Sequence, residues 1–330
     1  MLIPPTQNTS THSHGPGETD ADCRQYKAEL EYIAAAVKQR KCILFIGSAI
    51  HAPAPTGCGY SYPADQCPPI GGELAELLAR ACNYPDKDRW NLQRVAWYYE
   101  HVRKFRSLLI DEVKSAVHTG RRPSPALRGL ARLGFPIVIT TNYDQLYERS
   151  LDLLAQEQAR SLGIAEDKVA SIKASYDKCI YSPSSTAPTG DCLEKPDSAR
   201  PYLLKIHGDV DSPESIVITD EDYIQFVLRM GDKHPYHPVR KNVLTHLKNW
   251  PTLFIGYRLS DYNLRLLFKT LRWKMDAASI PPTYAVDLQP DVLIRDVWEN
   301  QRRYIRFITR NLWTFVPDLY REVTGEEMPQ

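Results

Sequence analysis

Four apolar segments, each ending in small or polar residues, constrain the fold of this sequence most strongly. They cover residues 43–50, 138–144, 203–209 and 253–261. Nearly continuous apolar runs are typical of strands that are buried on both faces, as in parallel sheets. Because ligands of open parallel sheets bind beyond the carboxyl ends of the strands, the four endings predict one shared crevice.

Strand and helix patterns alternate through the second half of the chain. This alternation predicts an α/β fold with a doubly wound, mainly parallel, Rossmann-like sheet. Further short strands are expected at residues 215–219, 283–287 and 304–308. Helices are expected at residues 22–40, where Asp22 could serve as the N-cap, and at 90–117, 124–133, from 219, at 239–249 and from 261.

The chain divides into a tail and one large unit. Residues 1–21 are rich in Thr, Ser, Pro and Gly and predict a flexible N-terminal tail, not a secretion signal. Residues 22–330 are long enough to bury a sizeable core as one domain. Helical patterns over residues 72–133 predict a small helical subdomain inserted between the first two strands. The irregular segment 52–70 is typical of a lid or binding loop, and 182–200 of a surface loop.

Charge and cysteine content give no support to several classes of function. The net charge is +1 and basic residues are interspersed with acidic ones, so nucleic-acid binding is not supported. The seven cysteines form no Cys-x-x-Cys pair, which argues against a disulfide framework or a zinc cluster. No apolar run is long enough to cross a bilayer. These observations favour a cytoplasmic protein without a metal.

Two of the strand endings carry side chains suited to catalysis. The run 205–209 ends in His-Gly-Asp, where the glycine permits a tight turn and His207 can face the crevice. A histidine with an ordinary pKa near neutrality can accept a proton. Asn142 and Asp144 follow the 136–141 strand and are either an ordinary turn or, with His207, a set that could orient water and bind a carboxamide.

The first strand ends in the turn Gly47-Ser48-Ala49. Such a turn can approach a phosphate or can simply connect a strand to a loop. It lacks the spaced glycines of the dehydrogenase fingerprint, and it has no lysine for a nucleotide triphosphate loop. Taken alone, the turn therefore leaves both possibilities open.

In their order along the chain, these segments resemble the motifs of the sirtuin-like family. The matching segments are Gly47-Ser48 after a first strand, Thr141-Asn142-Tyr143-Asp144, residues 205–209 and residues 254–261. The chain looks most like the bacterial branch of this family, which includes NAD-cleaving effectors of anti-phage defence. The resemblance extends over nearly all of the chain that follows the tail.

The resemblance implies that residues 22–330 form an NAD-binding catalytic domain. It implies catalytic roles for Asn142 and His207. It further implies NAD-binding residues at Gly47, Ser48 and Ala49 for the pyrophosphate, at Asp144 for nicotinamide, and at Gly256 and Tyr257 for the adenosine end, with Thr141 as a further NAD-binding residue. Two departures stand out: the family's Gly-Ala-Gly is here Gly-Ser-Ala, and the paired cysteines that hold zinc in protein-deacylating sirtuins are absent.

The resulting hypothesis is an NAD hydrolase that cleaves the bond between nicotinamide and ribose. Since a hydrolase of this kind would kill its own cell if it were always active, we expect gating by self-association or by a regulatory partner protein. Two alternatives stay open. One is an NAD-dependent protein deacylase, which the missing cysteine pairs disfavour. The other is a sensor that binds NAD or ADP-ribose without turnover, which the intact Asn142 and His207 disfavour.

Overall fold

The computed structural model describes residues 20–85, 87–183, 185, 196–232, 238–257, 281–293, 295–296 and 305–330. Three predictions lie largely outside these ranges. They concern the N-terminal tail, the loop at 182–200, and the end of the fourth segment at 258–261 together with the helix expected after it.

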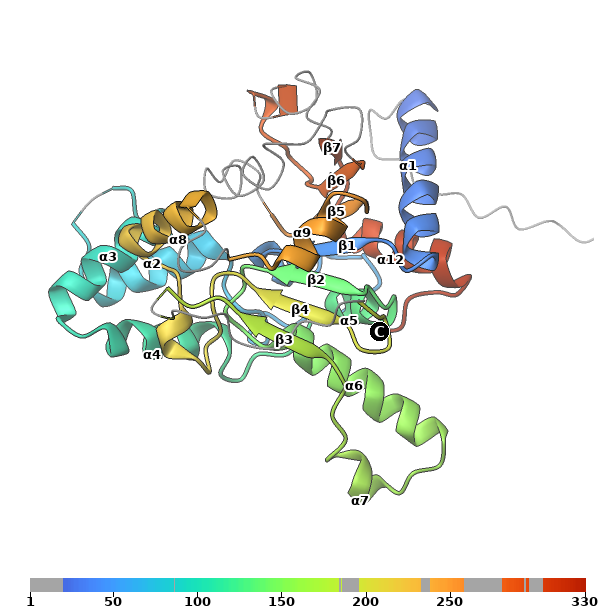
Figure 1. The fold of residues 1–330 in the computed structure, drawn as a ribbon, viewed down its shortest axis with the longest axis horizontal. Coiled ribbons are helices and arrows are strands. Elements are labelled where there is room, and N and C mark those ends of the chain that lie inside the picture. Colours follow the sequence, from blue (N-terminus) through green and yellow to red (C-terminus); the bar gives the residue numbers. More distant parts are fainter. Residues whose placement is uncertain are drawn as a thin grey trace, which may run out of the picture.

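A seven-stranded sheet forms the centre of the described structure (Figure 1). Its strands are β1 (Ile43–Ile46), β2 (Ile137–Thr140), β3 (Asp177–Ile180), β4 (Tyr202–Lys205), β5 (Thr252–Ile255), β6 (Thr283–Val286) and β7 (Ile305–Ile308). Their order across the sheet is β3-β4-β2-β1-β5-β6-β7, and every neighbouring pair is parallel.

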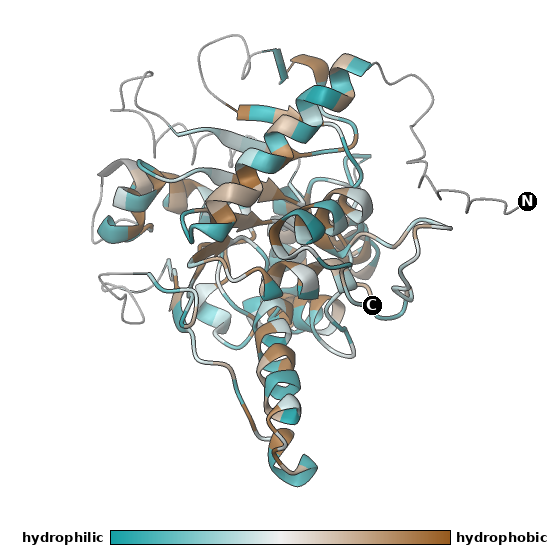
Figure 2. Cartoon of the chain, turned by 90° about the vertical axis from the view of Figure 1, so that its right-hand side faces the viewer, coloured by the Kyte–Doolittle hydropathy of each residue, from teal (hydrophilic) through white to brown (hydrophobic). Residues whose placement is uncertain are grey.

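Helices cover both faces of this sheet, because alternate residues of a strand point to opposite sides. Leu44 and Ile46 belong to one core, and Phe45 belongs to the other. The first face carries α1 (Asp20–Lys38), α5 (Pro125–Arg132), α6 (Leu146–Ser161) and α12 (Leu312–Thr324), and the second carries α8 (Asp220–Asp232) and α9 (Lys241–Leu247). Figure 2 shows hydrophobic residues gathered along the strands between these layers. The predicted α/β fold with a doubly wound parallel sheet is confirmed.

Three helices between β1 and β2 share a core of their own. They are α2 (Gly71–Ala81), α3 (Leu92–Arg103) and α4 (Arg106–Val117). Their buried residues pack against Tyr143, Val210 and Ile216, which follow strands β2 and β4. In Figure 1 these helices lie at the edge toward which the arrows of β2, β3 and β4 point. The carboxyl ends of these strands are therefore covered by a small helical layer.

The direction of chain growth across the sheet reverses at β1. From β1 the chain adds β2, β3 and β4 on one side, and it later adds β5, β6 and β7 on the other side. A reversal of this kind is a topological switch point, where open α/β sheets bind their ligands. A ligand site is therefore expected among the segments that follow β1, β2 and β5.

The segment 52–70, interpreted from sequence as a lid or binding loop, is fastened to the body by several hydrogen bonds. The Tyr62 hydroxyl donates to the Arg122 carbonyl at 2.8 Å, and the Trp313 indole donates to the Ala52 carbonyl at 3.2 Å. At its far end, the Gly71 amide donates to the Ser48 hydroxyl at 3.3 Å. Both ends of the loop therefore lie beside the turn that follows β1.

Two sequence predictions about individual elements were wrong, and one strand was missed. Residues 215–219 form no strand: η2 (Pro213–Ser215) is a short 3-10 helix, and the Val217 amide then donates to the His207 carbonyl at 3.0 Å. Strand β3 was not anticipated, because its sequence Asp-Lys-Cys-Ile lacks the apolar run of the central strands. It lies at the edge of the sheet, where buried and half-buried residues alternate. Helix α1 begins at Asp20, so Asp22 lies within its first turn and is not the N-cap.

We predict that Gly256→Ala lowers the free energy of unfolding by about 3 kcal/mol, because both its conformation and its surroundings require glycine. Its φ is +78°, and an added Cβ would lie 2.5 Å from the Ile50 amide nitrogen and 2.6 Å from the Gly47 carbonyl oxygen. Urea unfolding followed by circular dichroism measures the change. Gly57→Ala is the matched control: its φ is +82° and no atom lies within 4 Å of the added Cβ, so we expect a loss of about 1 kcal/mol. Equal losses in both variants would contradict the close packing at Gly256.

Candidate active site

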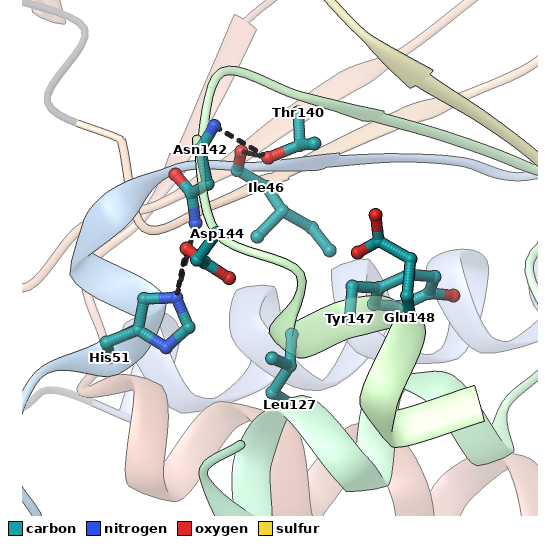
Figure 3. Close-up of a pocket in the computed structure, with 8 residues that line it drawn as sticks. All are labelled: Ile46, His51, Leu127, Thr140, Asn142, Asp144, Tyr147 and Glu148. Carbon is teal, nitrogen blue, oxygen red and sulfur yellow. Dashed lines mark hydrogen bonds and ion pairs between the residues drawn. The ribbon is translucent and has the colours of Figure 1, made fainter. Parts of the chain in front are cut away.

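The segments that follow β1 and β2 meet in a small buried pocket (Figure 3). Its lining residues are Ile46, His51, Leu127, Thr140, Asn142, Asp144, Tyr147 and Glu148. The Thr140 side chain links the ends of β1 and β2. Its hydroxyl donates to the Ile46 carbonyl at 2.9 Å and accepts from the backbone amide of Asn142 at 3.0 Å. The polar groups of the pocket thus start from a fixed backbone.

His51 is the central polar group of this pocket. It is the last residue of η1 (Ser48–His51), the 3-10 turn that follows β1, and only 2% of its surface is exposed. Its Nε2 lies 3.3 Å from Asn142 Nδ2 and 3.3 Å from Asp144 Oδ2. Among the described residues, neither Asn142 Oδ1 nor His51 Nδ1 has a hydrogen-bond partner, although both atoms are buried.

Asp144 is held in its charged form. Burial alone would raise the pKa of this carboxyl, but His51 and the Lys205 ammonium outweigh burial and lower it. The Leu146 amide also donates to Asp144 Oδ1 at 2.8 Å, at the start of α6. The pocket therefore contains a fixed carboxylate beside an imidazole and an amide.

A buried ammonium lies behind the pocket. Lys205 is fully buried, and its Nζ donates to the Asp144 carbonyl at 2.5 Å and to the Tyr143 carbonyl at 3.4 Å. The same Nζ lies 2.9 Å from Asp209 Oδ2 and 3.5 Å from Glu148 Oε1. Burial would lower the pKa of Lys205, but the neighbouring carboxylates outweigh burial and raise it. The ammonium thus joins the segments that follow β2 and β4.

His207 lies on the opposite side of the sheet from the His51 pocket. Its Nδ1 is 3.3 Å from the Tyr223 hydroxyl, and the rings of Tyr223 and Phe226 stand edge-on to it at 5.0 and 5.3 Å. These two rings belong to the second core, on the face of α8. Burial lowers the pKa of His207 to about 3. The expectation of an ordinary pKa near neutrality was therefore wrong, because the imidazole is enclosed by aromatic rings from α8.

The backbones that carry Asn142 and His207 nevertheless run side by side. Strands β2 and β4 pair with Thr140 opposite Lys205, and each of the two side chains comes two residues after this pair. The Ile206 amide donates to the Thr140 carbonyl at 3.0 Å, which continues the pairing beyond the strands. The structure thus brings the two backbone segments together but directs Asn142 to the His51 pocket and His207 to α8.

Tyr257 connects the segment after β5 with the segment after β2. Its hydroxyl accepts from the Thr141 amide at 3.2 Å and lies 3.0 Å from the Thr141 hydroxyl. Its ring packs edge-on against Phe45 of β1 at 5.4 Å. Thr141 and Tyr257, both expected at the NAD site, therefore contact each other across the end of β1, at the switch point.

The Gly47-Ser48-Ala49 turn contacts the segment after β5 closely. The Gly47 amide donates to the Ile255 carbonyl at 2.9 Å and the Ala49 amide donates to the Gly256 carbonyl at 3.0 Å. A Cβ on Gly47 would lie 2.4 Å from the Gly256 carbonyl oxygen. Packing between the two turns already accounts for the glycine at 47, and its role toward a pyrophosphate stays a prediction.

Sequence reasoning assigned no role to His51, Lys205 or Glu148. The signals were present but weak: an imidazole directly after the first turn, and a lysine inside an otherwise apolar strand. Within the described ranges, no group of three or more His, Cys, Asp or Glu side chains could hold a metal ion. None of the described helices is long and apolar enough to span a membrane.

Comparison with known proteins identifies the family. A model of the SIR2-like domain matches residues 136–308, which is more than half of the chain. The chain belongs to the SIR2-like family. The matched region extends from β2 to β7. It therefore contains Asn142, His207, and Gly256 and Tyr257 after β5. The sirtuin-like resemblance seen in the motifs is confirmed.

Three relatives of the SIR2-like chain are distant. The NAD(+) hydrolase ThsA of Acinetobacter baumannii is 25% identical over 248 residues, which cover 75% of this chain and 42% of that protein. The NAD(+) hydrolase ThsA of Bacillus cereus is 27% identical over 302 residues, which cover 87% and 53%. Defense-associated sirtuin 2 of Bacillus subtilis is 28% identical over 141 residues, which cover 41% and 10%. The chain spans about half the length of the two hydrolases.

We predict that Lys205→Met lowers the free energy of unfolding by about 3–5 kcal/mol at pH 7, because Asp209 and Glu148 lose their fully buried ammonium and keep only the partly exposed Lys178, at 3.1 and 3.8 Å. The pKa of Asp209 is held at about 2 although burial would raise it, since Lys205 and its hydrogen bond lower it. A lowered pKa stabilises the fold above the usual carboxyl range, and this contribution is lost as the pH falls from about 4 to about 2. In Lys205→Met, that loss between pH 4 and pH 2 should shrink. Urea unfolding at a series of pH values measures both effects.

Lys173→Met is the matched control for this substitution. Lys173 is 74% exposed and pairs with Asp152 at 2.9 Å, so we expect a loss below about 1 kcal/mol. A Lys205→Met protein as stable as this control would show that the buried ammonium is not needed.

Proposed function

We propose that this SIR2-like chain is an NAD hydrolase that releases nicotinamide and ADP-ribose, and that it acts in anti-phage defence by depleting NAD in the cytoplasm. The observation that carries the proposal is the half-buried Asn142 side chain at the switch point, whose buried Oδ1 has no hydrogen-bond partner among the described residues. The family and the two relatives named NAD(+) hydrolases support the same reaction.

The reaction breaks the bond between ribose C1′ and the nicotinamide nitrogen. The bonding electrons leave with the neutral nicotinamide, the water oxygen bonds to C1′, and one proton is released. Positive charge develops on the ribose in the transition state, so a fixed dipole or carboxylate nearby lowers the barrier. Asn142 Oδ1 can orient a ribose hydroxyl or the attacking water, and Asp144 can accept a hydrogen bond from the carboxamide.

His207 is the proposed proton acceptor. Its pKa of about 3 keeps the imidazole neutral at pH 7 but makes it a weak base among the rings of α8. Because Nδ1 lies 3.3 Å from the Tyr223 hydroxyl, the proposed role falls to Nε2 and requires the imidazole to turn toward the Asn142 pocket. We propose that Gly47, Ser48 and Ala49 contact the pyrophosphate, that Gly256 and Tyr257 contact the adenosine end, and that Thr141 completes the NAD-binding set.

We predict that purified protein releases nicotinamide and ADP-ribose from NAD, and that Asn142→Ala and His207→Ala each lower kcat/KM by about 100-fold or more. Both products are measured by liquid chromatography, and thermal unfolding confirms that each variant is folded. His101→Ala is the control, since this histidine is exposed on α3, and it should retain full activity. Consumption of NAD only in the presence of an acylated peptide would indicate a deacylase. Binding of NAD without product would indicate a sensor.

We further predict that nicotinamide release per molecule rises with protein concentration, because the proposed activity must be gated to be tolerated by the cell. The gate would be a homo-oligomer or a regulatory partner protein. The rate is measured over a hundredfold range of concentration, and light scattering on the same samples gives the mass of the particles. A rate per molecule that is constant while the mass increases would contradict gating by self-association.

A further inference from the structure

His51 occupies a position that none of the proposed catalytic steps uses. It is almost fully buried, yet it belongs to a turn at the switch point and faces two polar side chains from the segment after β2. Figure 3 shows its ring pointing from η1 toward Asn142 and Asp144. A buried imidazole in this position can set the orientation of a neighbouring side chain.

One ring nitrogen is shared by an amide and a carboxylate. Nε2 lies 3.3 Å from Asn142 Nδ2 and 3.3 Å from Asp144 Oδ2. A ring nitrogen carries either a hydrogen or a lone pair. With a hydrogen, Nε2 donates to the Asp144 carboxylate, and without one it accepts from the Asn142 amide. Each form makes only one of the two hydrogen bonds, so the tautomer decides whether the imidazole holds the carboxylate or the amide.

The free end of the Asn142 amide follows from this contact. When Nδ2 faces the imidazole, Oδ1 must point away from it, and Oδ1 is the buried atom without a partner among the residues described. The Asp144 carboxylate is held whichever form His51 takes, because the Leu146 backbone amide donates to its Oδ1. His51 therefore defines which atom of the Asn142 amide faces a substrate, beside a carboxylate that the backbone already holds.

We propose that His51 is a positioning residue that holds Asn142 and Asp144 in register with the two sides of the bond to be broken. This inference rests on the proposed NAD hydrolysis. Asn142 would act on the ribose side and Asp144 on the nicotinamide side, so His51 couples the orientation of the nucleophile to the binding of the leaving group. It makes no contact with the substrate itself.

Two substitutions separate positioning from simple loss of packing. His51→Leu keeps a buried side chain of similar size but removes both contacts. His51→Gln offers one amide that can donate to Asp144 and accept from Asn142 at the same time. We expect His51→Leu to lower kcat/KM by about 100-fold, with a lower kcat and a higher KM, because displacement of reacting groups by about 1 Å costs that much. His51→Gln should recover most of this loss, and His101→Leu on exposed α3 should change nothing.

A competing nucleophile tests the orientation of water directly. In aqueous methanol, the ribose is captured by water or by methanol, and the product ratio reports how strictly the enzyme orients water. We expect His51→Leu to increase the methyl ADP-ribose fraction severalfold and His51→Gln to restore the ratio. A variant that only loses folded protein would lower kcat while KM and the product ratio stay as in the unsubstituted chain, and that result would overturn the proposal.

A readout without turnover separates this inference from the proposed function. In ¹⁵N-labelled protein, the side-chain amide signal of Asn142 is assigned by its disappearance in Asn142→Ala. We expect this signal to move in His51→Leu toward the position of a solvated amide. If it does not move, His51 does not position Asn142. If it moves but the unsubstituted chain releases no nicotinamide, the positioning holds and the proposed NAD hydrolysis fails.

Discussion

The site depends on the buried ammonium of Lys205. Two strands that end side by side leave carbonyl groups pointing into the interior, and a buried carbonyl without a partner destabilises the fold. Lys205 Nζ donates to the carbonyls of Tyr143 and Asp144 and is neutralised by Asp209 and Glu148. Burial of charge is costly unless every charge is paired. The pairing therefore fixes the backbone that carries Asn142.

The same segment is held from its other side by packing and hydrogen bonds at the switch point. Tyr257 contacts Thr141 through its hydroxyl, and Gly47 lies against Gly256 at a distance that excludes any side chain. The three segments after β1, β2 and β5 are thus mutually fixed. A preorganised site of this kind loses little free energy to rearrangement when a transition state forms.

Much of this architecture was predictable, because apolar runs that end in small or polar residues are a strong signal. Such runs identified β1, β2, β4 and β5, and the position of Asn142 and Asp144 beyond β2 followed from them. The 215–219 run misled because its three consecutive β-branched apolar residues, 216–218, are typical of a strand. In the fold, Ile216 and Ile218 enter the core of α2 to α4 while Val217 enters the core beneath α8. Its apolar residues bridge two cores, so it needs no strand partner.

The environment of His207 and the contacts of His51 were not predictable, because both depend on elements distant in sequence. The rings that lower the pKa of His207 come from α8, and the partners of His51 lie more than ninety positions along the chain. A single sequence shows which side chains have the chemical groups needed for catalysis. It does not show which way each one turns beyond the last residue of its strand, where the regular alternation of faces ends.

The hydrogen bond between the Gly71 amide and the Ser48 hydroxyl brings the two ends of the segment between them to one point. Because Ser48 holds the first residue of α2, the length of the intervening chain does not by itself set where α2 starts. Residues could be added at the exposed positions 55–57, before the part of the segment that Tyr62 fastens to the body, while the entry of the helical layer keeps its alignment with η1. The segment is therefore a place where related proteins can diverge in surface shape without altering the geometry beneath it.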